Sequence, residues 1–121
     1  MGGTLYTFNG GGTSGSWTDA SIWTTDPTGS TSVNPRVPAS GDAVFVTNSF
    51  VVFSNSAIST TGLDLTIQRG GVLDLQSAAA TLATLNSLSG QGTLRIGAPY
   101  FPGVTTNNFD DANTGTVEYY N

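Results

Sequence analysis

Residues 89–97 read SGQGTLRIG, in which the alternating polar and apolar residues TLRI follow one glycine corner and precede another. The same Gly-x-apolar-x-apolar pattern, which starts here at Gly92, starts 21 residues earlier at Gly71 and 23 residues later at Gly115. Alternation over so short a stretch is typical of a β-strand with one buried face. Its recurrence at a period of about twenty residues indicates small units that stack, because one unit cannot bury its own apolar face.

Other runs of β-forming residues lie between turns rich in Gly, Pro, Asn and Ser, which is the pattern of an all-β protein. One stretch, residues 78–83, has helical character, and it is too short to be stable alone. The predicted strand runs are residues 44–46, 51–53, 63–67, 72–75, 85–88, 93–96 and 116–120. We therefore predict a right-handed parallel β-helix, or β-solenoid, of about three to four coils.

The three glycine-bounded segments predict the register of these coils. If they are successive rungs, side chains alternate inward and outward along each strand. The expected inward positions are all apolar: Leu73, Leu94, Val117, Leu75, Ile96 and Tyr119. The outward position between them reads Asp74, Arg95 and Glu118, so the charge alternates along a structural outer ladder. Opposite charges on neighbouring strands favour this register over one shifted by a residue. We expect Asp64 and Asp74, which alternate with leucines, to point outward.

The first forty residues differ from the rest, because their large aromatic residues lie among Gly and Ser runs. Stacked coils need a cap, since an open terminal coil is an exposed sheet edge. We therefore divide the chain into an N-terminal aromatic cap, residues 1–40, and coils at residues 41–121. The coils are expected to continue beyond residue 121, and the open C-terminal coil to contact a further domain or chain. A β-sandwich, with the glycine-bounded segments in antiparallel pairs, is the alternative fold.

Composition excludes several classes of function. Charged residues are 9% of the chain, lysine and histidine are absent, and the net charge is −5. A nucleic-acid-binding protein needs a basic surface to neutralise phosphates, so nucleic acid is not an expected partner. A polybasic membrane contact is excluded for the same reason. No segment approaches the roughly 18 apolar residues of a membrane span. The surface is instead expected to be rich in hydroxyl groups, because the chain has 19 Thr and 13 Ser.

Catalytic and metal-binding signals are weak. Without His, Cys or Lys there can be no Ser-His or Cys-His pair and no Schiff base. Carboxylates remain, but no positioned acid and base pair is identifiable, so no enzyme and no cofactor are predicted. Asp111 and Asn113 begin a D-x-N-x-G stretch that is similar to the start of a calcium loop. Calcium at these two residues is therefore a weak hypothesis, since such clusters usually form turns.

Two pairs of stretches carry a family resemblance. YTFNGGGTSGSWTDASIWTT followed by PASGDAVFV resembles the opening of secreted bacterial β-solenoid proteins. LNSLSGQGTLRIG and NTGTVEYYN are similar to repeats of large surface proteins and adhesins of the Bacteroidetes, which include gliding-motility adhesins exported by the type IX secretion system. The resemblance implies a right-handed parallel β-helix with an N-terminal cap. It places Trp17, Asp19 and Trp23 in the cap, and Gly41 and Asp42 in the turn into the first coil.

The resemblance also implies a function and a location. The chain would be a non-enzymatic module of a secreted adhesin or surface repeat protein, forming a rigid stalk at the bacterial cell surface. Its partners would be cell-surface proteins or extracellular glycans. The alternative is a glycan-binding module of a secreted carbohydrate-active protein, in which exposed aromatic rings stack on sugars. The candidate contacts are Trp17, Trp23, Tyr100 and Phe101.

Overall fold

A computed structural model describes residues 3–47, 49–54, 56–76, 82–97, 102–109 and 115–120. Over these residues the chain forms eleven short strands and one 3-10 turn, η1. The strands before residue 50 are β1 (Thr4–Thr7), β2 (Ser14–Ser16), β3 (Trp23–Thr24) and β4 (Ala43–Val46), with η1 at Ala20–Ile22. The later strands are β5 (Val51–Ser54), β6 (Asp64–Ile67), β7 (Val72–Leu75), β8 (Leu85–Ser89), β9 (Thr93–Ile96), β10 (Val104–Asn107) and β11 (Thr116–Tyr119).

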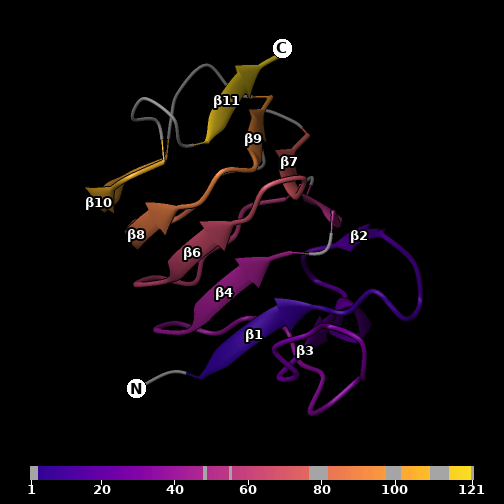
Figure 1. The fold of residues 1–121 in the computed structure, drawn as a ribbon. Coiled ribbons are helices and arrows are strands. Elements are labelled where there is room, and N and C mark those ends of the chain that lie inside the picture. The colour runs from indigo at the N-terminus through magenta and orange to yellow at the C-terminus, as the bar shows by residue number, and fades with distance from the viewer. Residues whose placement is uncertain are drawn as a thin grey trace.

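The strands form two mostly parallel sheets (Figure 1). Sheet A has the order β10-β8-β6-β4-β1-β3, and sheet B has the order β11-β9-β7-β5-β2. From β4 onward, successive strands alternate between the sheets, so neighbours in a sheet are two strands apart in the chain. Every pairing is parallel except that of β1 with β3, which is antiparallel.

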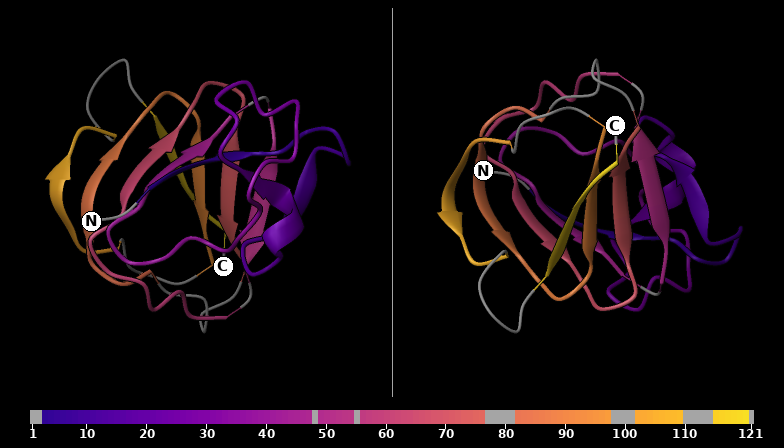
Figure 2. Two further views of the ribbon diagram at one scale, coloured as in Figure 1. Left: turned by 90° about the horizontal axis from the view of Figure 1, so that it is seen from below. Right: turned by 90° about the horizontal axis from the view of Figure 1, so that it is seen from above.

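The two sheets face each other across one hydrophobic core (Figure 2). Side chains alternate along each strand, and in β4, β5, β6 and β9 every second residue is buried. Apolar residues from successive strands therefore lie over one another inside. Leu73 of β7 and Leu94 of β9 are directly opposite and fully buried, and Val117 of β11 continues their row.

The glycine-bounded segments of β7, β9 and β11 are neighbours in sheet B, and they pair in parallel. The antiparallel pairing that a β-sandwich would require is therefore not present among these segments. The spacing of 21 to 23 residues is the length of chain that leaves a strand of sheet B, forms a strand of sheet A and returns to form the next strand of sheet B.

The prediction of a right-handed parallel β-helix of three to four coils with an N-terminal aromatic cap is wrong. The structure is a small domain of two mostly parallel sheets with almost no helix. The physical reason lies in the first forty residues, which do not form a separate cap. β1 pairs with β4 and β2 pairs with β5, so this segment supplies strands to both sheets. Trp17 and Trp23 belong to the same core as the later leucines.

Glycine is required at one corner between the sheets. Gly90, between β8 and β9, has a φ of 111°, which L side chains rarely adopt. A Cβ at this position would lie 2.1 Å from the carbonyl oxygen of Ile67. Because residue 90 has no side chain, the backbone of this corner can pass close to the backbone of Ile67 at the end of β6.

Candidate functional site

A charged cluster on the outer face of sheet B, hereafter the Arg95 ladder, consists of Asp74, Arg95, Glu118 and Tyr120. The first three occupy one row of β7, β9 and β11, where each is directly opposite the next. Arg95 donates from Nη1 to Oδ2 of Asp74 over 3.0 Å and from Nε to Oε1 of Glu118 over 2.8 Å. The structure thus places the arginine between the two carboxylates.

Tyr120 completes this cluster from the residue after β11. Its hydroxyl donates to Oδ1 of Asp74 over 2.6 Å, and its ring centre lies 4.3 Å from the guanidinium carbon of Arg95. That distance is within the range of a cation–π contact. Asp74 projects from the outer face but is buried, at 8% exposure. The outward direction expected for this residue therefore does not make it a solvated carboxylate.

The charged groups of the Arg95 ladder contact one another: Arg95 pairs with both carboxylates, and Tyr120 donates to one of them. Burial, the hydrogen bond to Asp74 and the negative charge of Asp74 raise the pKa of Tyr120 to about 12. The hydrogen bond to Glu118 is the largest influence on the pKa of Arg95, and it acts to raise it. The tyrosine therefore stays protonated and the arginine charged at neutral pH. Neither group is suited to exchange protons with a substrate.

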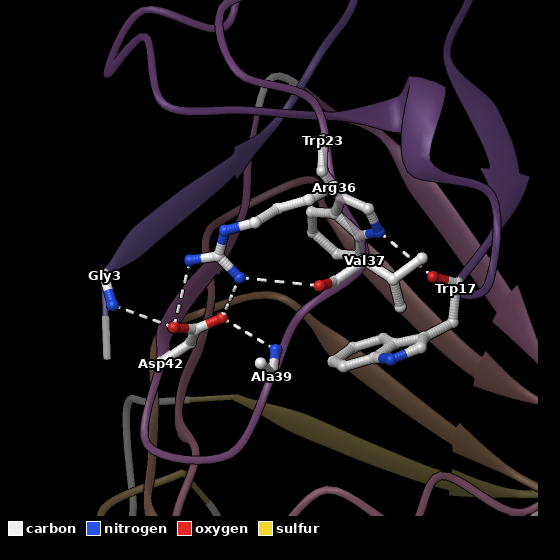
Figure 3. A network of polar contacts seen from close by, with 7 residues as sticks. All are labelled: Gly3, Trp17, Trp23, Arg36, Val37, Ala39 and Asp42. Atoms are coloured by element: carbon white, nitrogen blue, oxygen red, sulfur yellow. Dashed lines mark hydrogen bonds and ion pairs between the residues drawn. The ribbon is translucent and has the colours of Figure 1, made fainter. Parts of the chain in front are cut away.

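A second charged network joins the first strand to the start of β4 (Figure 3). Asp42, which is 1% exposed, accepts hydrogen bonds from Nη1 and Nη2 of Arg36 at 2.6 and 3.1 Å. It also accepts from the backbone N–H groups of Gly3 at 2.8 Å and Ala39 at 2.7 Å. Asp42 thus joins the residue before β1, the segment at residues 36–39 and the start of β4.

Burial acts to raise the pKa of Asp42, but other influences outweigh it. The hydrogen bonds from Arg36, Ala39 and Gly3, together with the positive charge of Arg36, place the pKa below its ordinary value of 3.8. Asp42 is therefore ionised under ordinary conditions. In the structure Asp42 lies directly before β4, and its hydrogen bonds hold the turn that leads into this strand.

Trp17 and Trp23, two of the candidate glycan contacts, lie inside the protein. Their exposures are 2% and 0%, and the rings meet edge to face with centres 5.2 Å apart. The indole N–H of Trp23 donates to the carbonyl oxygen of Trp17 over 3.0 Å (Figure 3). Both rings are thus used for packing, and neither presents a face to a sugar. Tyr100 and Phe101, the other candidate contacts, lie outside the described residues.

The possible calcium ligands, Asp111 and Asn113, also lie outside the residues that the structure describes. Within the described ranges, no group of three or more His, Cys, Asp or Glu side chains is arranged to hold a metal ion.

The remaining described carboxylates support turns and strand pairing. Asp19 accepts from the backbone N–H and hydroxyl of Ser21 and caps η1. Asp26 accepts from the turn that follows it. Asp64 on β6 accepts from Asn86 and Ser87 of the neighbouring strand β8, each over 2.7 Å. These hydrogen bonds hold the pKa values of all three carboxyl groups below 3.8.

Two shallow hollows lie near the N-terminal strands. One, of about 130 Å³, is bordered by Asp19 and Ser21. The other, of about 150 Å³, is bordered by Trp17, Val37 and Thr60, whose buried hydroxyl has no hydrogen-bond partner. The first hollow has one titratable side chain in its lining and the second has none. Neither therefore brings together the two groups that acid and base catalysis requires.

Comparison of the chain with protein-family models, curated proteins and solved structures finds no match. The described ranges hold no helix of the length and apolar character needed to cross a membrane.

Sequence reasoning did not find two features of these networks. The sequence carried only an indirect signal for the pairing of Arg36 with Asp42. The chain has three arginines and 9% charged residues, and where charges are so few, a specific partner for each is expected. Tyr120 had no such signal. The predicted register places the β9 segment between those of β7 and β11, but it does not predict that the side chain of Tyr120 reaches across β9 to Asp74.

Proposed function

We propose that the chain is a non-enzymatic structural module of a bacterial cell-surface protein, where it gives rigid support for adhesion or attachment. The observation that carries the proposal is that every described carboxylate and every arginine contacts another residue of the domain. The carboxylates are Asp19, Asp26, Asp42, Asp64, Asp74 and Glu118, and the arginines are Arg36, Arg69 and Arg95. Neither hollow described above is lined by two of these groups, as acid and base catalysis on a substrate would require.

The packing supports the rigid part of the proposal. The two sheets enclose one continuous core whose members include Leu5, near the start of β1, and Phe109, between β10 and β11. Parallel hydrogen-bonded ladders run through both sheets across this core. Each inner strand is therefore held on both sides by backbone bonds and on one face by apolar contacts.

The cell-surface part of the proposal rests on composition and on the resemblance to secreted surface proteins. A chain without lysine, with 9% charged residues and many Ser and Thr, has an outer surface of hydroxyl and amide groups. Such a surface can contact other surfaces through hydrogen bonds without large charge repulsion.

Two measurements on the same protein test the proposal. Native-state hydrogen exchange should show that the amides of β4 to β9 exchange together, with the free energy of global unfolding. A screen against polysaccharides, including uronic-acid polymers with calcium, should show no turnover. The proposal is overturned by turnover that disappears when Asp64 is changed to Asn without a change in stability. It is equally overturned if the strands exchange independently.

Glycan binding at Trp17 and Trp23 has less support, because both rings are buried. Titration with oligosaccharides should leave the tryptophan emission unchanged. A saturable change in emission would favour the glycan-binding alternative.

A further inference from the structure

The end of the domain formed by β10 and β11 differs from the end formed by β1 to β3. β10 is the outermost strand of sheet A and β11 the outermost strand of sheet B (Figure 1). Within the described ranges, no strand pairs with the outer side of either one. At the opposite end, sheet A finishes with the antiparallel strand β3, and η1 packs beside β2.

The inward side chains of β11 are incompletely covered. Val117 is opposite the fully buried Leu94, and Tyr119 is opposite Ile96, which is 1% exposed. Val117 is only half-buried, and Tyr119 is 52% exposed although it occupies an inward position. Tyr120 beside it is 39% exposed. Of the large apolar side chains exposed in the described chain, only Val33 lies elsewhere.

The backbone of β11 also presents unused groups. The N–H groups of Thr116 and Tyr120 donate to Gly92 and Ile96, on the side of β9. In a parallel strand, alternate residues bond to opposite sides, so the N–H and C=O groups of Val117 and Tyr119 point away from β9. An edge of this kind can accept a further strand.

Charge indicates which strand would fit. The outer row of sheet B runs Asp74, Arg95 and Glu118, and Glu118 is 51% exposed. A strand beside β11 that continued the alternation would carry a basic residue next to Glu118. The chain has no lysine, and its other two arginines bond to Asp42 and Gln91.

A second copy of the chain is a poor occupant. Each copy carries a net charge of −5, and antiparallel pairing of two β11 strands in a register centred on residue 118 would place two copies of Glu118 opposite each other. Like charges at such positions destabilise a strand pair.

We propose that β11 is a docking edge for an extended segment of another protein, which places apolar residues beside Val117 and Tyr119 and a basic residue beside Glu118. The segment adds a strand to sheet B, in the manner of β-strand addition. Its backbone bonds to Val117 and Tyr119, its apolar side chains cover the end of the core, and its cation pairs with Glu118. This inference adds a partner to the structural module proposed above but does not depend on its cellular location.

The sequence of β9 supplies a probe, because β9 already makes these three contacts from the other side of β11. The probe is a synthetic peptide of sequence QGTLRIG, copied from residues 91–97. Its matched control is the same peptide with glutamate in place of arginine. Binding to the whole chain is measured by calorimetry, and the site is located by backbone amide shifts in NMR spectra. We expect the arginine peptide to bind at β11, and the glutamate peptide to bind at least about tenfold more weakly.

Variants of the chain sharpen the test. Glu118→Gln should reduce the preference for the arginine peptide to less than about threefold, since the charge that selects it is gone. Asp26→Asn, which removes one charge from a turn near the opposite end, should leave the preference unchanged. Tyr119→Pro removes an outward N–H group while keeping every bond to β9, and should abolish binding of both peptides. Thermal unfolding of the Tyr119→Pro variant is the control that checks whether its fold persists.

Several results overturn the docking proposal. They are no binding of either peptide, equal binding of the two peptides, and amide shifts centred away from β11. A concentration-dependent dimer that Tyr119→Pro abolishes would assign the edge to a second copy of the chain, and would also overturn it. None of these results touches the structural-module proposal, which is decided by hydrogen exchange and the turnover screen.

Discussion

The hydroxyl of Tyr120 donates to Oδ1 of Asp74 over 2.6 Å, although 46 residues separate the two in the chain. The bond reaches from the end of β11, across β9, to β7, the next strand but one in the sheet. Arg95 lies between them on β9 and contacts both. Three successive strands of sheet B are therefore joined by side chains as well as by their backbones.

The buried member of the Arg95 ladder should matter most for stability. We expect Asp74→Asn to lower the free energy of unfolding by about 2 kcal/mol, because Arg95 and Tyr120 both lose a charged acceptor that is shielded from water. Glu118→Gln, at a half-exposed position, should cost less than about 1 kcal/mol. Urea unfolding of the two variants beside the unchanged chain gives both values. Equal losses would show that burial does not set the strength of these contacts.

The hydroxyl of Tyr120 should lose its proton at a higher pH than that of an ordinary tyrosine. Its pKa is about 12, against an ordinary value of 10.0, so ionisation is harder in the folded protein. The raised pKa, which comes from partial burial and then from the contact with Asp74, means that protonated Tyr120 stabilises the fold fully below pH 10.0. This contribution is lost as the pH rises through about 12. Absorbance titration of phenolate should show one late component that is missing in Tyr120→Phe. If that component instead titrates near 10.0, the bond to Asp74 is absent in solution.

Asp42 predicts a loss of stability in acid. Its pKa in the folded state lies below the ordinary value of 3.8, so ionised Asp42 stabilises the fold above pH 3.8. That contribution disappears as the pH falls through the lower folded value. Unfolding free energies measured from about pH 6 to about pH 2 should therefore fall less steeply for Asp42→Asn than for the unchanged chain. The half-buried Asp26, whose pKa is also below 3.8, provides the comparison. Asp26→Asn should flatten the slope less, because the hydrogen bonds to Asp26 come from its own turn. A slope as flat as that of Asp42→Asn would count against the special role of Asp42.

The corner at Gly90 should not accept a side chain. Gly90→Ala would combine a φ of 111° with a Cβ placed 2.1 Å from the oxygen of Ile67. We expect a loss of more than about 2 kcal/mol, because neither the backbone of Ile67 nor the corner can move freely. Gly103→Ala, whose Cβ would lie 3.3 Å from the hydroxyl of Thr84, should cost clearly less. Thermal unfolding of the two variants measures the difference, and similar losses would mean that the corner adapts.

The strands between residues 43 and 96 were predictable because each carries its own pattern. For example, the run at residues 72–75 coincides with β7, and the run at 93–96 coincides with β9. The alternation of polar and apolar residues between two glycines is visible within each short run. Alignment of these runs also predicts which residues of β7, β9 and β11 lie opposite one another. β10 was not predicted, because Val104 is its only apolar residue.

The first forty residues show where local patterns are insufficient. β1 and β2 are short strands among glycines, and their partners, β4 and β5, lie more than thirty residues further along the chain. The aromatic residues there indicated burial correctly, but they could equally belong to a cap or to a sheet. Only the long-range pairing of Leu5 with Val44 distinguishes the two.

That same pairing affects how the chain emerges from a ribosome. β1 finds its antiparallel partner β3 after 24 residues, but its parallel partner β4 is complete only at Val46. Until then Leu5 has no strand to cover it on that side. Each later strand of sheet A, in contrast, is made directly beside a partner that already exists, about twenty residues behind it. The segment from β1 to β4 is thus the part of sheet A whose strands wait longest for a parallel partner, and the later strands can pair in the order in which they are translated.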